Sequence, residues 1–153
     1  MSSVPVNAAP GARRPRRKPG ENRASLLAAG TIEFARYGYA ATQTSAIATR
    51  AGVSQPNVYA NFASKEELFL ECLRTSLSCI ELAVAQEPEE LAPVHACLLF
   101  QAIASIGLRE VGESVQSQLR HLVSVIGQDA FEAMVLQGQS LLMTVIALSP
   151  DKL

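Results

Sequence analysis

The sequence predicts an all-α protein, and three observations support this. Apolar residues make up 48% of its 153 residues, whereas aromatic residues make up 5% and Trp is absent. A core of mostly Ala, Leu, Val and Ile suits close-packed helices better than a sandwich of strands. Apolar residues recur at helical spacing from Asn22 onward, and no useful length of chain alternates with the period of two typical of a strand. We therefore expect about seven helices and no strand.

Three of these helices are expected in the first 65 residues. The first runs from Asn22 to Gly38, because glycine often ends a helix. The second begins at Thr42, whose hydroxyl can cap it, and ends at about Ala51. The third covers about residues 54–62, with a serine as its cap and a proline in its first turn, where the missing N–H does no harm.

Four further helices are expected after residue 63. The first of them begins at Ser64 with Glu67 at the capping-box position, and it ends before Pro88. The others are expected at about residues 91–108, 113–126 and 129–148. The chain would therefore comprise an N-terminal three-helix unit and a short C-terminal helical part.

Composition and charge divide the chain further. Residues 1–20 contain four prolines and two glycines, and we interpret them as a disordered basic arm. Residues 1–65 hold nine Lys or Arg against two acids, whereas residues 66–153 hold four against twelve. The cationic first part suits a polyanionic partner, which the second part would repel. We expect a binding domain at residues 21–64 and a helical regulatory and dimerisation domain at residues 65–153.

Other classes of function find little support. Cys72, Cys79 and Cys97 are too few and too irregularly spaced for a disulfide scaffold or a zinc site, and His95 and His121 have no ligand-spaced partner. No Ser-His-Asp set, Gly-rich phosphate loop or carboxylate pair stands out, so we expect neither an enzyme nor a cofactor. No apolar run approaches the ~18 residues of a membrane helix, so we expect a cytoplasmic protein without a membrane partner.

The segment from Thr42 to Phe62 has the design of a helix-turn-helix. Its two short helices are joined by a tight turn in which Gly52 supplies backbone freedom. A small core can close beneath them from Ile47, Ala48, Ala51, Val53 and Val58. The outer face of the second helix then carries Gln55, Pro56, Asn57, Tyr59 and Asn61. Such a helix fits the major groove of DNA, where Gln can pair with adenine and a proline ring can press on a thymine methyl group.

Several short motifs follow one another at fixed spacing in this region: Phe34…Gly38-Tyr39…Thr42, Ile47-Ala48…Ala51-Gly52-Val53-Ser54, Val58-Tyr59-Ala60-Asn61-Phe62 and Ser64-Lys65-Glu66-Glu67-Leu68. In their order and spacing, residues 22–70 resemble the DNA-binding domain of the TetR family of transcriptional regulators. The resemblance implies that Gln55 and Pro56 touch bases, that Tyr59 contacts the backbone or a base, and that Lys65 binds phosphate.

We therefore expect double-stranded DNA as a partner, bound through Thr42, Ser54, Gln55, Pro56, Asn57, Tyr59, Asn61 and Lys65. Thr44 is expected to point inward instead. The arm offers Arg13, Arg14, Arg16 and Arg17, which would lie along the phosphates or enter an adjacent minor groove. A merely solubilising role for the arm is the alternative.

The last two helices are expected to form a homodimer. The resemblance implies that they pair with those of a second chain in a four-helix bundle. Independently, the last helix is apolar on much of its circumference, which a single chain cannot cover on every side. We expect the interface at Phe131, Val135, Gly138, Leu142, Val145 and Ile146, with Gly138 allowing close approach.

A pocket for a small-molecule effector is expected between the fourth, fifth and sixth helices. Its candidate lining is Cys72, Ser76, Cys97, Phe100, Gln101, Ser105, Leu119 and His121, which would favour an apolar or aromatic ligand. The alternative interpretation is that these residues simply form the core.

The sequence thus predicts a sequence-specific, ligand-responsive, homodimeric repressor that reads a palindromic operator. Two other hypotheses remain open. One is a non-specific architectural DNA-binding protein driven by the basic arm, and the other is a helical protein-interaction module without a DNA role.

Overall fold

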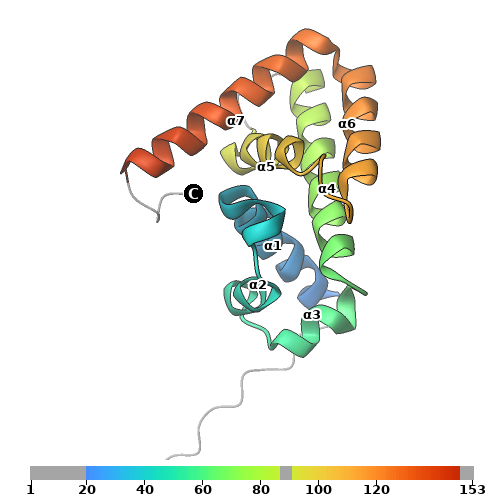
Figure 1. The fold of residues 1–153 in the computed structure, drawn as a ribbon, viewed down its shortest axis with the longest axis vertical. Coiled ribbons are helices and arrows are strands. Elements are labelled where there is room, and N and C mark those ends of the chain that lie inside the picture. Colours follow the sequence, from blue (N-terminus) through green and yellow to red (C-terminus); the bar gives the residue numbers. More distant parts are fainter. Residues whose placement is uncertain (1–19, 87–90, 149–153) are drawn as a thin grey trace, which may run out of the picture.

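The computed structural model describes residues 20–86 and 91–148, with side chains up to Thr144 in the last helix. These residues form seven helices, and no strand occurs among them, which confirms the predicted all-α fold (Figure 1). The helices are α1 (Glu21–Ala41), α2 (Thr44–Ala51), α3 (Gln55–Asn61), α4 (Lys65–Gln86), α5 (Pro93–Ala104), α6 (Gly112–Ile126) and α7 (Gln128–Leu148).

The helix ends follow local chemistry in most places. Gly38 interrupts α1 with φ of 75°, and Gly52 ends α2 with φ of 67°, a conformation that favours glycine. At the start of α4, the Ser64 hydroxyl accepts a hydrogen bond from the Glu67 N–H at 3.2 Å. The Glu67 carboxylate in turn accepts one from the Ala63 N–H at 2.6 Å, so that both residues cap this helix as expected.

Two expected helix boundaries differ from the structure. Thr42 does not cap α2, because its hydroxyl is buried and donates to the carbonyl oxygens of Gly38 (2.7 Å) and Glu33 (3.1 Å); Gln43 occupies the N-cap position. The fifth helix is shorter than residues 91–108, since Pro93 occupies its first turn and a tight turn at Ser105 ends it. In the first case the Thr42 hydroxyl bonds back to α1, and in the second a proline and a tight turn set the ends of the helix.

One continuous core joins the two ends of the molecule. Phe34 and Tyr39 of α1 meet Phe69 of α4, with ring centroids 5.0 and 5.1 Å from that of Phe69. The same buried cluster continues through α4, α5 and α6 to Leu142 of α7. Figure 1 shows α5 lying between α1 and α7, with α2 and α3 at the opposite end of the molecule from α7. Within the described residues, no helix is long and apolar enough to cross a membrane.

Candidate DNA-binding site

A small core holds α2 and α3 together as a helix-turn-helix. Ile47, Ala48 and Ala51 of α2 are buried against Val58 of α3, which is fully inaccessible to solvent. Because α3 has only seven residues, burying Val58 on one side turns the residues on either side of it outward. The local sequence therefore decides which face of α3 is presented.

The outer face of α3 was predicted to carry five residues that contact DNA. Gln55 and Pro56 are exposed in its first turn, and the side chain of Tyr59 is 53% exposed one turn later. Asn57 and Asn61 are half-buried, and their amide groups serve the helix itself: Asn57 Nδ2 donates to Ser54 Oγ at 2.8 Å and Asn61 Nδ2 to the Asn57 carbonyl at 2.7 Å. Gln55, Pro56 and Tyr59 are thus the most available of the five.

An open hollow of about 560 Å³ lies beside this face, between the end of α1, the start of α2 and α3. Its lining is mainly polar and includes Gln43, Thr44, Ser45, Gln55, Tyr59 and Lys65. The first N–H groups of α2 have no intrahelical partner by position, so the start of this helix suits an anion. The hollow brings hydroxyl groups, N–H groups and one ammonium group together.

Lys65 is held at the rim of the hollow by the end of α1. Its Nζ lies 3.5 Å from the Ala40 carbonyl oxygen and 4.6 Å from the centroid of the Tyr39 ring. Partial burial lowers the pKa of Lys65. Burial also raises the pKa of Tyr39 to about 12, with a further contribution from the Glu66 carboxylate, so this phenol stays neutral at physiological pH.

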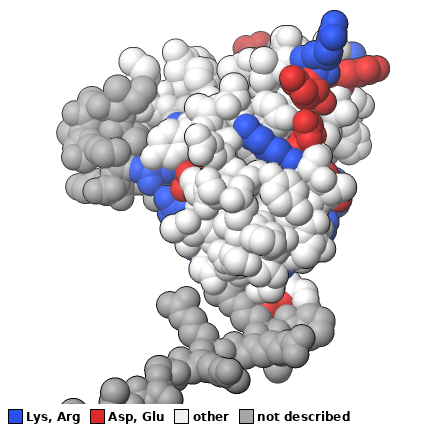
Figure 2. All heavy atoms as spheres, turned by 60° about the horizontal axis from the view of Figure 1, so that its bottom comes forward, with Lys and Arg blue, Asp and Glu red and all other residues white. Residues whose placement is uncertain are grey.

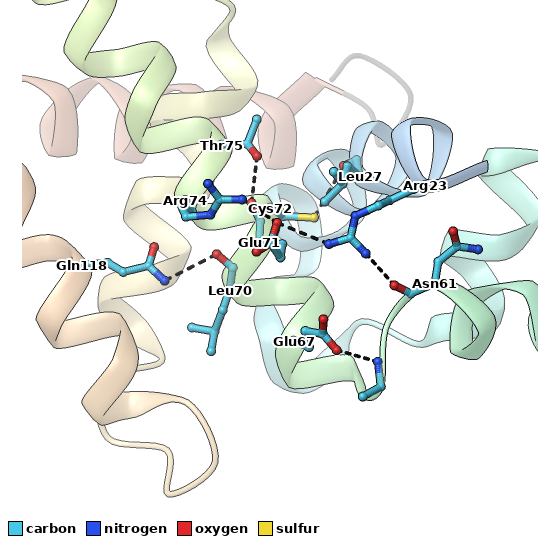
Figure 3. A network of polar contacts seen from close by, with 11 residues as sticks. Arg23, Leu27, Asn61, Glu67, Leu70, Glu71, Cys72, Arg74, Thr75 and Gln118 are labelled. Atoms are coloured by element: carbon cyan, nitrogen blue, oxygen red, sulfur yellow. Dashed lines mark hydrogen bonds and ion pairs between the residues drawn. The ribbon is translucent and has the colours of Figure 1, made fainter. Parts of the chain in front are cut away.

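Most cations of the helix-turn-helix region make contacts inside the chain. Arg23 Nη1 donates to the Asn61 carbonyl at 2.5 Å and Nη2 lies 3.5 Å from the Glu71 carboxylate, which ties α1 to α3 and α4 (Figure 3). Arg50 pairs with Glu33 at 2.6 Å. In Figure 2, which brings the lower end of Figure 1 forward, Lys and Arg atoms form small separate patches on a mostly uncharged surface. Arg13, Arg14, Arg16 and Arg17 lie outside the described residues.

The other hydroxyl residues near the predicted DNA-binding face differ in exposure and in their hydrogen bonds. Ser54 is exposed next to α3, and it accepts the hydrogen bond from Asn57. Thr42 is 3% exposed and its hydroxyl is used inside the chain, so it is not available as a phosphate ligand. Thr44, expected to point inward, is buried as well, but its hydroxyl contacts both Gln55 and Tyr59. No local pattern reveals this role, because the contacts span 11 and 15 residues.

Neither the hollow beside α3 nor a second one between α4 and α6 brings together the residues predicted to line an effector pocket. Cys72, Ser76 and Cys97 are fully buried in the core, and Ser76 Oγ lies 3.0 Å from His95 Nδ1. Burial raises the pKa of Cys72 to about 12, so its thiol stays protonated. A hollow of about 390 Å³ between α4 and α6 is lined by His121, the only one of the eight predicted residues among its walls.

The predicted interface side of α7 is used largely within the chain. Gly138 is buried, and a Cβ there would lie 2.1 Å from the Ala96 carbonyl oxygen of α5. Leu142 belongs to the core, and Phe131 and Val135 pack against it; the side chains of Val145 and Ile146 lie outside the described ones. Among the described side chains of α6 and α7, the large apolar residues that remain exposed are others, namely Leu136 and Met143 of α7 and Val125 of α6.

Comparison with known proteins bears on the helix-turn-helix region directly. Residues 26–72 match the family model described as bacterial regulatory proteins, tetR family. Over 120 residues the chain is 31% identical to an uncharacterized HTH-type transcriptional regulator, YhgD of Bacillus subtilis (strain 168), and the match covers 66% of this chain and 63% of that protein. Over 77 residues it is 42% identical to the HTH-type transcriptional activator FasR of Mycolicibacterium smegmatis, covering 50% of this chain and 35% of that protein.

The chain thus spans less than two thirds of the length of either relative. Among solved structures, a TetR-family regulator from Streptomyces coelicolor A3 is 21% identical, with 88% of this chain and 82% of that chain covered and a TM-score of 0.38. The family match lies on α1 to α4, the segment that builds the helix-turn-helix, and both relatives are named as transcriptional regulators. Residues 26–72 of this chain are therefore similar to bacterial regulatory proteins of the tetR family.

Proposed function

We propose that the protein is a sequence-specific DNA-binding repressor that acts in the cytoplasm as a homodimer on a palindromic operator. The observation that carries this proposal is the outward placement of Gln55, Pro56 and Tyr59 on α3, beside a polar hollow. A buried Val58 fixes that placement, so the three residues are presented by a rigid helix and not by a loop.

Gln55 and Pro56 are the residues that read sequence. They occupy the first turn of α3, the part of a recognition helix that reaches base edges in the major groove. The Gln55 carboxamide offers the donor and the acceptor that adenine requires, and the Pro56 ring supports apolar contact with a thymine methyl group. An adenine next to a thymine in each half-site is the simplest target for this pair.

The hollow beside α3 anchors the DNA backbone. The residues at the start of α2, Tyr59 and Lys65 all line this hollow, and their N–H, hydroxyl and ammonium groups are suitable partners for a phosphate. These contacts position the protein without reading sequence. Their geometry supports a division of labour in which Gln55 confers preference and Lys65 confers general affinity.

Two copies are needed to read an operator with two half-sites. A single short recognition helix contacts few base pairs, and dimers place two such helices about one helical turn or more apart. Leu136 and Met143 of α7 and Val125 of α6 are more than half exposed, and a second copy would cover them. We therefore place the dimer interface on the outer surface of α6 and α7.

Ligand response and repression complete the proposal. An apolar or aromatic effector would enter between α4, α5 and α6, where Cys72, Ser76 and Cys97 lie within the core, and it would favour a spacing of the two DNA-binding ends that no longer fits the operator. Since the relative FasR is named an activator, a reporter gene behind the chain's own upstream DNA decides the direction. Higher expression without the protein supports repression, and lower expression contradicts it.

Binding to the upstream DNA and to a scrambled duplex of equal length tests the DNA-binding proposal. We expect the wild type to prefer the upstream DNA, Gln55→Ala to lose that preference, and Lys65→Ala to weaken binding to both duplexes about equally. Equal affinity of the wild type for both duplexes would contradict sequence-specific binding. If Gln55→Ala has no effect but deletion of residues 1–20 abolishes binding, the protein is instead an architectural DNA-binding protein driven by its basic arm.

A further inference from the structure

Thr44 occupies the point where α2 meets α3 on the DNA-facing side. It is the first residue of α2, and only 8% of it is exposed. Its Oγ1 accepts a hydrogen bond from Gln55 Nε2 at 3.3 Å and lies 3.1 Å from Tyr59 Oη. One buried hydroxyl therefore contacts a residue in the first turn of α3 and another residue one turn later.

The hydrogen bonds around Thr44 leave a defined set of groups for a ligand. One N–H of Gln55 is used by Thr44 Oγ1, so the carboxamide presents Oε1 and its second N–H to the outside. The Thr44–Tyr59 contact consumes one of the two hydroxyl hydrogens, and the other remains available. When Thr44 donates to Tyr59, a chain of hydrogen bonds runs from the Gln55 amide through the hydroxyl of Thr44 to that of Tyr59, and each bond polarises the next. Tyr59 then offers its own hydrogen to an acceptor.

We infer that Thr44 is a positioning residue for operator recognition, which fixes the carboxamide of Gln55 and the phenol of Tyr59 before DNA arrives. This inference rests on the proposed function, since it assigns a specificity role to a residue too buried to read a base itself. Donor and acceptor exchange places when a carboxamide turns over, and only one orientation matches adenine. When Thr44 donates its hydrogen to Tyr59, its oxygen can only accept from the carboxamide, so the Nε2 side must face Thr44 and that orientation is selected.

Removing the hydroxyl has a specific consequence. Thr44→Val keeps the branched shape of the side chain but offers no acceptor to Gln55 and no partner to Tyr59. The carboxamide can then turn over, and ordering it in the complex becomes part of the binding free energy. We expect the preference for operator over scrambled duplex to fall about tenfold, which corresponds to the loss of one or two ordinary hydrogen bonds.

Two variants make this effect specific. Thr44→Ser retains the hydroxyl and should restore most of the preference. Thr49→Val is the matched control, because Thr49 lies on the same helix and its hydroxyl donates only to the Ser45 carbonyl at 3.0 Å. Thr49→Val should leave the preference unchanged. In the Gln55→Ala background, Thr44→Val should alter the preference for the base read by Gln55 by less than about twofold, since the residue through which it acts is gone.

NMR relaxation of the Gln55 side-chain amide, measured in the free protein, tests positioning without DNA. We expect the amide to be ordered in the wild type and mobile in Thr44→Val. The melting temperatures of the wild type and of Thr44→Val show that both proteins fold. An equally ordered amide, or an unchanged operator preference, in folded Thr44→Val overturns the role of Thr44 while leaving the proposed function in place. A wild type that shows no preference among duplexes overturns both.

Discussion

Arg50 Nε lies 2.6 Å from Glu33 Oε1, and this ion pair joins α2 to the middle of α1. The Glu33 side chain is 8% exposed, whereas that of Arg50 is 34% exposed. The carboxylate therefore depends on its partner much more than the guanidinium does, because a buried charge without a partner is strongly unfavourable.

Loss of Arg50 should destabilise the whole fold. We expect Arg50→Ala to lower the free energy of unfolding by about 2 kcal/mol, since the pair is only partly shielded from water. Urea unfolding followed by circular dichroism measures this. Arg74→Ala is the control: Arg74 pairs with Glu71 at 2.7 Å but is 65% exposed, and its removal should cost less than about 0.5 kcal/mol. Equal effects of the two substitutions would contradict a special role for the Glu33 pair.

The contact of Gly138 with α5 should tolerate no side chain. A Cβ at this position would lie 2.1 Å from the Ala96 carbonyl oxygen, and backbone atoms on both helices would have to move. We expect Gly138→Ala to lower the free energy of unfolding by about 3 kcal/mol, typical of an overpacked core. Gly107→Ala is the matched control, because no atom lies within 4 Å of an added Cβ there. An unaffected unfolding midpoint for Gly138→Ala would show that α7 packs elsewhere.

The proposed dimer interface can be tested at Leu136. This side chain is 65% exposed on α7, so a charge there leaves the monomer's core intact. We expect Leu136→Lys to convert the dimer to a folded monomer in sedimentation velocity runs, because a lysine would be buried without a partner in the interface. Thr75→Lys adds the same charge on an exposed part of α4 and should leave the dimer unchanged. If the Leu136→Lys protein remains a dimer, the interface does not lie on this surface.

His95 should make the protein less stable in mild acid. Burial lowers the pKa of His95 in the folded state, so the unfolded chain binds this proton at higher pH than the folded one does. Stability is therefore expected to fall as the pH drops below the ordinary histidine value of 6.5 and to level off below the folded pKa. Melting temperatures between pH 7.5 and 5 measure this, with His95→Gln expected to flatten the difference. His121→Gln, which alters an exposed histidine, should not flatten it.

The basic arm should steepen the salt dependence of DNA binding. Deletion of residues 1–18 removes five cations, whereas deletion of residues 1–12 removes none and serves as the matched control. Each phosphate neutralised contributes about 0.9 to the slope of log K against log salt concentration, so the longer deletion should flatten the slope by up to roughly 4. Identical slopes for both deletions would assign the arm a role other than phosphate binding.

The sequence predicted best where one residue decides the backbone. Gly38 and Gly52 interrupt helices at positive φ, and Ser64 caps α4, because these effects depend on neighbours along the chain. The outward placement of Gln55 and Tyr59 was equally predictable from the sequence. In a helix as short as α3, the burial of Val58 leaves few orientations for the other side chains.

Prediction failed where more than one set of partners was possible for a residue. Thr42 has the composition of a cap, yet the end of α1 offers its hydroxyl two carbonyl groups and draws it inward. Apolar residues surround much of α7, which indicates that more than one side of the helix is buried. The pattern does not show which side faces α5, so Gly138 was assigned to the dimer interface and not to its contact with α5. Thr44 was predicted to point inward, but its link to Gln55 and Tyr59 depends on how α2 crosses α3.

The continuity of the core from Leu26 to Leu142 has a consequence for how this protein is dissected. Cutting the chain after α3 would strip Phe34 and Tyr39 of Phe69, the ring that both of them touch. The helix-turn-helix and α7 should therefore unfold together as one cooperative unit. A bound operator should then raise the melting temperature of every helix by the same amount.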